Sequence, residues 1–435
     1  MFMEYLLTGT VVPRLLWRLR KNQWKTLRDL ESLQLKRLKA IVHFAYDYVP
    51  YYHYQFDSAK FKPDDLQSYE DLQKIPITKK TDVQTNNANI IARGVDTSKC
   101  IGFFTSGSTG LPLKTYKDRS ATWQDTALKV YAFLECGVTL TDKFVSVAWR
   151  QRSMMLPSQI LVSSRVYKTD AITDYLSRIK PDIIYAYPSF LEELCSFDTS
   201  GINPRLIFTQ ASTLTQHCRS LVRSTFGLEI YDTYGSTELG RLAFECDEHS
   251  GLHMITDAAV MEFVDDNGEL VAPGEIGEIV ATGLYNYTMP LIRYSLGDLG
   301  TLADGKCSCG RSWPLIKSIE GKSNDVIVMP SGRKIYPSFF LLGIENEIEE
   351  NPFCISQYQI IQEKRNKIIL KLVSGREFDR RVVSRIKQNF QNLFIRLNED
   401  VHIDMKCVEK IPLERTGKRR KLISLVGQHA HLKDH

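Results

Sequence analysis

The sequence lacks a long hydrophobic run, and no stretch approaches the ~20 apolar residues that a membrane-spanning helix needs. It also lacks a strong charge imbalance, because 56 Lys and Arg residues stand against 51 Asp and Glu residues. The resulting net charge of +5 is weak for 435 residues and does not predict a nucleic-acid partner. Hydrophobic residues at 43% with charged residues at 25% exclude wholesale disorder.

Cysteine is scarce, and nine cysteines, an odd number scattered along the chain, argue against a disulfide framework. The N-terminal segment is a poor export signal, because Glu4 comes early and Gly9 and Pro13 interrupt its apolar stretch. We therefore expect a reducing, cytoplasmic compartment. The basic segment Trp17–Trp24 suits either a peripheral membrane contact or a helix packed on the domain, and the helix is favoured.

The arrangement of apolar residues predicts several domains of mixed α/β structure. Intervals of three to five between apolar residues predict a helix over Trp24–Ala45, which Pro50 should end. After Cys100, short apolar runs alternate with amphipathic stretches, as in crossover units around a buried sheet. Residues 260–302 change to a hairpin-rich β pattern with a turn at Asn267-Gly268. The predicted buried strands are FVSVAW, DIIYAY, RLIFTQ and LEIYDTY.

The C-terminal part of the chain predicts a separate α+β unit. Two amphipathic segments, Phe339–Glu349 and Phe378–Leu397, should be helices, with two strands around a polar turn between them. Val401–Val408 alternates as a third strand. The predicted fold is therefore α/β, with a large N-terminal domain of several subdomains, residues 1–321, followed by a small α+β C-terminal domain, residues 322–435.

A strand end at Phe103-Phe104 runs into six consecutive small residues, and Lys114 follows shortly after them. Small residues let the backbone approach a ligand closely, and their hydroxyl and N–H groups suit phosphate oxygens. The spacing is neither that of a Walker A loop nor that of a dinucleotide-binding loop. A flexible surface loop is the alternative, but the strand before it and the lysine after it favour phosphate binding. The six residues are Thr105, Ser106, Gly107, Ser108, Thr109 and Gly110.

Three further segments combine small, aromatic and charged residues: YDTYGSTE over 231–238, IRYSLGD over 292–298 and PLERTGK over 412–418. Each segment alone is weak evidence for a functional site, since a Gly-Asp pair is usually a turn and 415–421 has the composition of a solvated basic tail. In their order and spacing, the four segments resemble the core motifs of the adenylate-forming superfamily of acyl-CoA ligases, peptide-synthetase adenylation domains and luciferases. RLKAIVHFAYDYVPYY and KIPITKKTDV are similar to its phenylacetate–CoA ligase-like branch, which includes proteins associated with capsular polysaccharide synthesis.

The resemblance implies two half-reactions. A small-molecule carboxylic acid attacks ATP to give an acyl-adenylate and pyrophosphate, and coenzyme A then displaces AMP. It also implies a mobile C-terminal domain whose Lys418 is catalytic in adenylation, and a catalytic Glu238 that holds Mg²⁺. Tyr234 would stack on adenine and Asp298 would bind both ribose hydroxyls. The other implied nucleotide-binding positions are Gly235, Ser236, Thr237, Lys322 and Arg293, the last of which could instead position its motif or form a surface pair.

Two hinge positions depart from the family pattern. Lys322 stands in place of an arginine, so it keeps the charge but loses the planar fork, and Asn324 replaces the usual acid. These departures motivate a catalytically silent nucleotide-binding scaffold as an alternative, against which the retained Glu238, Asp298 and Lys418 argue. A further alternative keeps adenylation but passes the acyl group to an amine or a carrier instead of coenzyme A.

Cys307 and Cys309 place two thiols on one tight turn, and Cys246, His249 and His253 lie upstream. Four N and S ligands in two pairs suit tetrahedral zinc. The expected structural Zn²⁺ site uses Cys246, His253, Cys307 and Cys309, with His249 as the substitute. The C-x-C-G-R element also resembles the phenylacetate ligase branch, some of whose members carry such a site. The alternative is that Cys307 and Cys309 are free thiols in a surface turn.

The acyl pocket is expected near two strand ends that carry aromatic residues. Two tyrosines and a phenylalanine there suit an aromatic or otherwise flat acid, although plain core packing explains them at least as well. The identity of the acid and the oligomeric state stay open, with a homodimer among the states considered. The pocket candidates are Tyr185, Tyr187, Pro188, Phe208 and Ala211.

Overall fold

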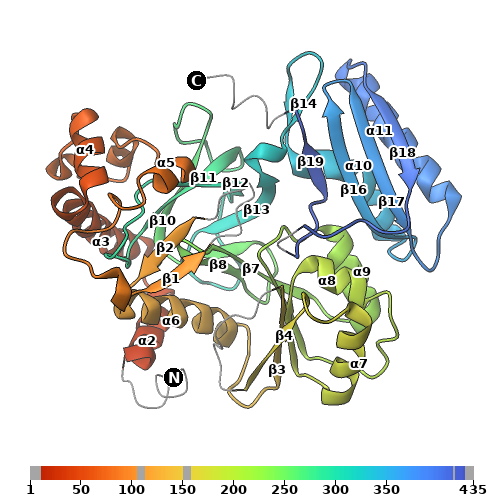
Figure 1. Ribbon diagram of the computed structural model, residues 1–435, viewed down its shortest axis with the longest axis horizontal. Coiled ribbons are helices and arrows are strands. Elements are labelled where there is room, and N and C mark those ends of the chain that lie inside the picture. Colours follow the sequence, from red (N-terminus) through yellow and green to blue (C-terminus); the bar gives the residue numbers. More distant parts are fainter. Residues whose placement is uncertain (1–10, 105–112, 150–157, 415–416, 427–435) are drawn as a thin grey trace. The chain divides into compact units, whose positions relative to one another are not determined.

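A computed structural model describes residues 11–104, 113–149, 158–414 and 417–426 (Figure 1). The fold has the mixed α/β class that the sequence predicts. None of the helices in the described part of the chain has the length and apolar character needed to cross a membrane. The chain divides into two compact units: unit 1 comprises Met1–Thr139, Met155–Pro157 and Thr233–Ile319, and unit 2 comprises Leu140–Met154, Ser158–Asp232 and Glu320–His435. The domain boundary at 321/322 stays a prediction.

The N-terminal helices of unit 1 follow local capping signals. The helix predicted over Trp24–Ala45 is α3, which begins later, at Leu27, because the Thr26 side chain caps its first turn. Pro50 follows the end of α3 and is also the first residue of α4, where its missing N–H costs nothing. Helix α2 contacts α6 through Arg18. The helices of unit 1 are α2 (Val11–Asn22), α3 (Leu27–Tyr48), α4 (Pro50–Ser58), α5 (Lys80–Thr85) and α6 (Arg119–Glu135).

Seven strands of unit 1 form a largely antiparallel sheet in the order β10-β11-β12-β13-β9-β8-β7, and β1 and β2 form a separate hairpin. The β-rich pattern predicted over 260–302 is confirmed as β10, β11 and β12, with Gly268 at φ 85° in the predicted turn. The strands are β1 (Ile101–Phe104), β2 (Lys114–Lys117), β7 (Ile230–Ser236), β8 (Gly240–Glu245), β9 (Leu252–Met254), β10 (Ala259–Val264), β11 (Ile276–Gly283), β12 (Tyr294–Leu302) and β13 (Leu315–Lys322).

Unit 2 contains four parallel strands in the order β6-β5-β3-β4. Parallel neighbours need crossover connections, and the helices α7, α8 and α9 follow β4, β5 and β6, as the alternating sequence pattern predicts. The four predicted runs correspond to β3, β5, β6 and β7, whereas β4 was not predicted. The elements are β3 (Phe144–Ala148), β4 (Gln159–Ser163), α7 (Thr169–Ile179), β5 (Ile183–Ala186), α8 (Pro188–Leu194), β6 (Leu206–Gln210) and α9 (Gln216–Phe226).

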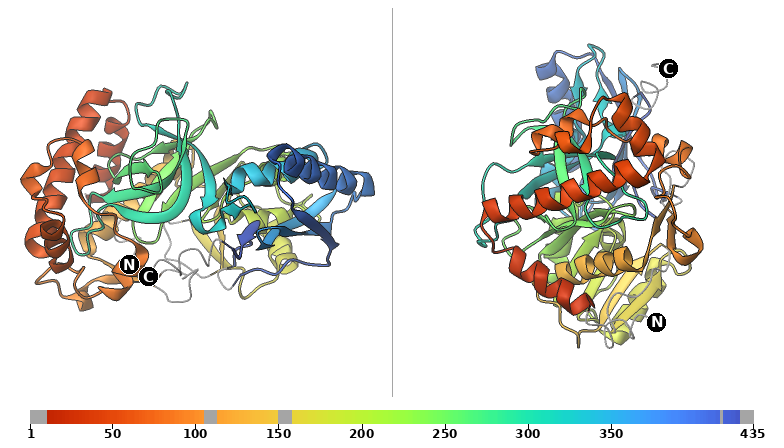
Figure 2. Two further views of the ribbon diagram at one scale, coloured as in Figure 1. Left: turned by 90° about the horizontal axis from the view of Figure 1, so that it is seen from above. Right: turned by 90° about the vertical axis from the view of Figure 1, so that its left-hand side faces the viewer.

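The C-terminal part of unit 2 is the predicted α+β arrangement, with a four-stranded sheet in the order β18-β17-β16-β19. Helices α10 and α11 cover one face of this sheet (Figure 2) and share a buried core with it through Phe340, Phe390 and Tyr358. Strand β19 was not predicted. The elements are β14 (Ile327–Val328), β15 (Lys334–Ile335), α10 (Pro337–Glu350), β16 (Ile355–Lys364), β17 (Lys367–Ser374), α11 (Arg380–Leu397), β18 (His402–Cys407) and β19 (Leu422–Ser424).

Candidate functional site

The hairpin of β1 and β2 flanks the predicted phosphate loop, and its last paired residues are Phe104 and Lys114. The loop residues 105–110 lie outside the described part of the chain. The Lys114 ammonium lies 4.7 Å from the ring centroid of Tyr116 and 5.6 Å from that of Phe104. These cation–π contacts place Lys114 along the hairpin beside the loop. Its phosphate contact stays a prediction.

A buried ion pair anchors the same hairpin to α6. Lys117 on β2 is fully buried, and its Nζ lies 3.5 Å from Oδ1 of Asp125, whose Oδ2 is 2.6 Å from Nζ of Lys129. Burial lowers the pKa of Lys117. Burial alone would raise the pKa of Asp125, but Lys117 and Lys129 hold it well below its usual range. The carboxylate is therefore ionised and fixes the base of the hairpin electrostatically.

Tyr234 and Asp298, both predicted nucleotide-binding residues, lie in contact within unit 1. The Tyr234 hydroxyl donates a hydrogen bond to Oδ2 of Asp298 at 3.0 Å. Tyr234 lies on β7 and Asp298 on β12, so tertiary structure joins two motifs that are distant in the chain. Burial, and then the Asp298 charge, raises the pKa of the Tyr234 hydroxyl, which therefore remains a donor.

A second hydroxyl–carboxylate pair involves Glu238. The Tyr294 hydroxyl donates to Oε1 of Glu238 at 3.1 Å, and both side chains are buried. Burial raises the pKa of Tyr294, with the Glu238 charge as the next cause. Oxygen ligands of this type suit Mg²⁺, and the second carboxylate oxygen of Glu238 is the candidate ligand atom. Tyr294 was not singled out from the sequence, although it directly follows Arg293 in a predicted motif.

The turn that carries Ser236, Thr237 and Glu238 lies between two glycines that tolerate no side chain. A Cβ on Gly235 would lie 2.2 Å from the carbonyl oxygen of Gly240. Gly240 has φ +77°, and its Cβ would lie 2.0 Å from Oδ1 of Asp125. Both positions therefore require glycine, and Gly240 connects the turn to the ion pair beneath the hairpin.

Arg293 is buried and its guanidinium is used inside the protein. Nε and Nη2 lie 3.2 and 3.1 Å from the carboxylate oxygens of Glu262, and Nη1 donates to the carbonyl oxygen of Ile75 at 2.7 Å. Nη2 also donates to the Gly268 carbonyl at 3.0 Å. The pair is not on the surface, so the surface-pair alternative is wrong. These contacts favour a role in positioning residues 292–298, and a direct nucleotide contact remains untested.

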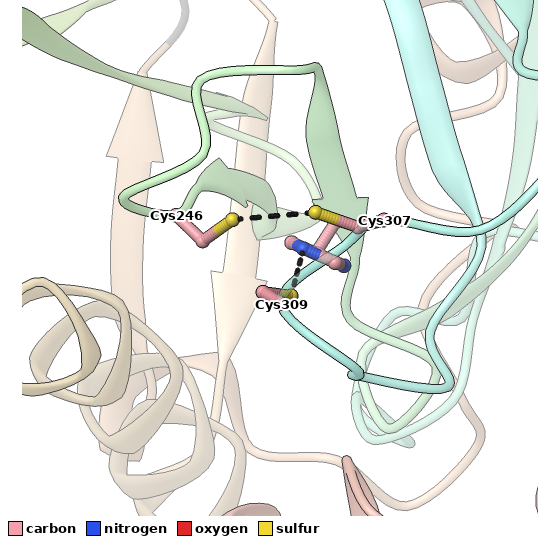
Figure 3. Close-up of side chains that lie close together, drawn as sticks. Cys246, Cys307 and Cys309 are labelled. Atoms are coloured by element: carbon pink, nitrogen blue, oxygen red, sulfur yellow. Dashed lines mark hydrogen bonds between the residues drawn. The ribbon is translucent and has the colours of Figure 1, made fainter.

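Cys246, His253, Cys307 and Cys309 gather in unit 1 with their candidate ligand atoms all within 4.8 Å of one another. Figure 3 shows the three thiols pointing toward one another. The Sγ atoms of Cys246 and Cys307 are 3.6 Å apart, and Nε2 of His253 is 3.3 Å from Sγ of Cys309. His249 is not part of this group. Cys307 is buried, so the description of it as a surface thiol is wrong.

The His253 side chain of this cluster suits a metal ion. Nδ1 of His253 lies 3.4 Å from the Trp313 carbonyl oxygen, an arrangement that directs Nε2 toward the cysteines. Burial lowers the pKa of His253 to about 4, so the imidazole is neutral at pH 7. Burial raises the pKa of the Cys246 thiol to about 12, and a bound cation would be needed to favour its thiolate form. One imidazole nitrogen and three sulfurs are a donor set that structural zinc accepts.

Lys418 lies in unit 2, in the segment between β18 and β19. Its carbonyl oxygen accepts a hydrogen bond from the Glu414 N–H at 2.8 Å. The preceding Gly417 has φ +78°, and a Cβ there would lie 2.6 Å from Cβ of Trp149. Lys322, at the end of β13, is exposed. The description of 415–421 as a solvated tail is wrong for Arg419, which is buried.

Comparison with known proteins identifies the family. A model described as "AMP-binding enzyme" matches residues 145–289, and one described as "CapK C-terminal domain" matches residues 328–424. A phenylacetate-coenzyme A ligase of Thermus thermophilus is 25% identical, with 91% of this chain and 96% of that protein covered. One of Aromatoleum evansii is 29% identical over 77% of this chain and 79% of that protein. The chain is therefore similar to adenylate-forming enzymes along most of its length, with the AMP-binding enzyme match confined to residues 145–289.

Among AMP-forming acyl-CoA ligases, the chain is similar to phenylacetate–CoA ligases. Protein CapK of Staphylococcus aureus is 24% identical, with 91% of this chain and 89% of that protein covered. A crystal structure of 2-hydroxyisobutyryl-CoA ligase, in the postadenylation state, has a TM-score of 0.79 at 19% identity, with 95% and 93% of the two chains covered. This structural likeness supports the α/β fold class.

The predicted acyl-pocket residues of this adenylate-forming chain lie in unit 2. Tyr185 and Phe208 are buried on β5 and β6, and the Tyr185 hydroxyl donates to the side-chain oxygen of Gln210. Ala211 has φ 67°, a conformation that residues other than glycine rarely adopt. The burial of Tyr185 and Phe208 favours core packing, and a pocket role stays a prediction. The other two candidates, Tyr187 and Pro188, form the N-cap and first residue of α8.

Proposed function

We propose that the chain activates a carboxylic acid with ATP and transfers the acyl group to coenzyme A. In the first half-reaction a carboxylate oxygen bonds to the α-phosphorus of ATP, the bond to pyrophosphate breaks, and an acyl-adenylate forms. In the second, the sulfur of coenzyme A bonds to the acyl carbon, the thiol proton is lost and AMP leaves. The relatives named phenylacetate-coenzyme A ligases support this reaction class, with an aryl acid as the first candidate substrate.

One observation carries the proposal: two hydroxyl–carboxylate pairs join segments 231–238 and 292–298 in unit 1. Asp298 would accept hydrogen bonds from the ribose hydroxyls, and Tyr234 would contact the adenine. Glu238 would bind Mg²⁺, which when bound neutralises charge that builds on the leaving pyrophosphate. Residues 105–110 and Lys114 would hold the phosphates. Lys418 would stabilise the reacting oxygens during adenylation.

An amine acceptor is the second candidate. The "CapK C-terminal domain" match over residues 328–424 and the similarity to Protein CapK favour it. The two acceptors are separated by measuring AMP release from the acyl-adenylate with coenzyme A or with an amine, such as an amino sugar. Release that depends on coenzyme A supports the first proposal, and release that depends only on the amine supports the second.

Structural zinc is part of the proposed function. Cys246, His253, Cys307 and Cys309 would hold the ion in a closed tetrahedral set, without a vacant position for substrate. Its contribution would be to fix the loop after β8 against the loop before β13, and not to take part in acyl transfer.

The test of adenylation is carboxylate-dependent ATP–pyrophosphate exchange across aryl, fatty, hydroxy and amino acids. We expect exchange with one class of acid and a loss of about 100-fold or more in Lys418→Ala. Lys406→Ala, which alters an exposed lysine on β18, is the matched control and should exchange like the wild type. Undiminished exchange in Lys418→Ala would exclude the catalytic assignment. Silence of the folded wild type with every acid and Mg²⁺ would favour the silent scaffold.

A further inference from the structure

A buried charge cluster in unit 2 involves the residues that directly follow Lys418. Nζ of Lys421 lies 2.7 Å from Oε1 of Glu192 on α8, and Nη1 of Arg419 lies 3.7 Å from Oε2 of the same carboxylate. The side chains of Glu192 and Arg419 are fully buried and that of Lys421 is 11% exposed. One carboxylate therefore faces two buried cations, both within three residues of Lys418.

The two cations have few other polar contacts. Nε of Arg419 donates to the Ile411 carbonyl oxygen at 3.3 Å, but its terminal nitrogens have no hydrogen-bond partner among the described residues. Its other nearby carboxylate is Glu193, at 3.8 Å. Nζ of Lys421 lies 4.3 Å from the ring centroid of Tyr358. Glu192 is thus the principal counter-charge, and its loss would leave both cations buried without adequate compensation.

The protonation states agree with an ionic cluster. Burial would raise the pKa of Glu192, but the charges of Lys421 and Arg419 lower it, so the carboxylate is ionised at neutral pH. Burial and the Lys421 charge lower the pKa of His217 to about 3, so this imidazole is neutral and adds no competing charge. The interaction is therefore between one anion and two cations in a site from which water is excluded.

The backbone around Lys418 is held from both sides. Before it, Gly417 packs against Trp149 so closely that a Cβ would lie 2.6 Å from the Trp149 side chain. After it, Arg419 and Lys421 extend into the charge cluster. We propose that Glu192 is a positioning residue that sets the backbone of Lys418 for adenylation by binding the cations that follow it. This inference rests on the proposed function of Lys418.

The experiment measures the two half-reactions separately in Glu192→Gln, which keeps the shape of the side chain and removes its charge. ATP–pyrophosphate exchange should fall by about 100-fold in kcat with little change in the KM for ATP, because misplacement of a catalytic group by about 1 Å costs that much. Thioester formation from preformed acyl-adenylate should change less than threefold, because Glu192 positions Lys418 for adenylation only. Glu347→Gln, which alters a partly buried carboxylate on α10 that pairs with Arg385, is the matched control and should keep the wild-type rate.

Hydrogen exchange of the amides in 417–421 supplies a readout that does not depend on activity. It should accelerate in Glu192→Gln and not in Glu347→Gln. The inference would be overturned if Glu192→Gln matched the wild type both in ATP–pyrophosphate exchange and in amide hydrogen exchange. Equal losses of adenylation and of thioester formation would also overturn it. If the wild type shows no adenylation, the proposed function is wrong. If amide exchange nevertheless accelerates in Glu192→Gln, the contact between Glu192 and the segment 417–421 is still supported.

A second variant guards against misfolding of Glu192→Gln. Lys421→Met removes the partner charge while keeping a side chain that can cover Tyr358. The combined variant Glu192→Gln/Lys421→Met should lose no more adenylation than Glu192→Gln alone, because both changes break the same interaction. If the losses of adenylation multiply in the combined variant, the two residues act independently, which would contradict a positioning role of the Glu192–Lys421 contact.

Discussion

Side-chain contacts decide whether each motif residue faces a ligand or the protein. Tyr234, Glu238 and Asp298 can be named from the sequence because the short segments that contain them resemble the motifs of adenylate-forming enzymes. Arg293 belongs to an equally short segment, yet its guanidinium is occupied by Glu262 and backbone carbonyls. The local sequence does not contain this information, because Glu262 lies in a different strand.

Gly240→Ala tests the packing beneath the motif turn. The new Cβ would meet Asp125 and the hydroxyl of Tyr285 at φ +77°, so we expect the free energy of unfolding to fall by about 3 kcal/mol. Gly94→Ala is the matched control, because Gly94 has φ +79° and no atom within 4 Å of its Cβ position. It should lose only about 1 kcal/mol. Urea unfolding measures both, and equal losses would contradict the packing argument.

Arg293→Lys tests whether the arginine fork is structural. Lysine keeps the charge but cannot bind Glu262 and two backbone carbonyls together, so stability should fall by about 2–4 kcal/mol. If the main role of Arg293 is to position residues 292–298, the KM for ATP of Arg293→Lys should change little even though the free energy of unfolding falls. A large rise in the KM with unchanged unfolding would instead indicate a direct nucleotide contact.

At the scale of elements, strand pairing builds what no single segment contains. Strand β9 lies between β8 and β13, so His253 on β9 comes close to Cys246, just after β8, and to Cys307 and Cys309, before β13. The sequence favours His253 and keeps His249 as the substitute, and the strand register decides between them. His249 instead has φ 46° in a turn and lies 3.4 Å from Glu245.

Zinc content tests the cluster. Purified wild type should hold about one equivalent of zinc, whereas Cys309→Ser should hold much less and unfold at lower temperature, since a structural site contributes several kcal/mol. His249→Ala should retain the metal, as a control outside the cluster. Metal analysis and thermal unfolding with and without a chelator measure both effects. Full zinc content in Cys309→Ser would remove Cys309 from the proposed ligand set.

At the scale of the whole molecule, the chain divides into two units, each built from segments that are distant in sequence. Unit 2 groups residues 140–232 with the C-terminal residues, including Glu192 with Arg419 and Lys421. From composition alone the basic run 418–421 suits solvent, because its carboxylate partner lies on α8, far along the chain. Sequence reasoning therefore missed Glu192, Arg419 and Lys421, and no local signal identifies them.

Gly417→Ala tests whether the close packing of Gly417 against Trp149 in unit 2 positions Lys418. A Cβ there would overlap Trp149, so we expect adenylation to slow by about tenfold while thioester formation from preformed acyl-adenylate slows less. Gly332→Ala is the control, because Gly332 has φ +89° and open space around its Cβ position. Equal slowing of the two half-reactions in Gly417→Ala would show that the contact has no special connection with adenylation.

The sequence by itself determined the α/β class and most strands and helices, because these follow from periodicity and turn chemistry, and its resemblance to adenylate-forming enzymes predicted the motif residues. Only the tertiary structure decided which of those residues contact one another. The pairs Tyr234–Asp298 and Tyr294–Glu238, the choice of His253, and the burial of Arg293 and Glu192 all depend on strand order and helix packing. A buried charge needs a counter-charge close in space, and closeness in space is set by the fold.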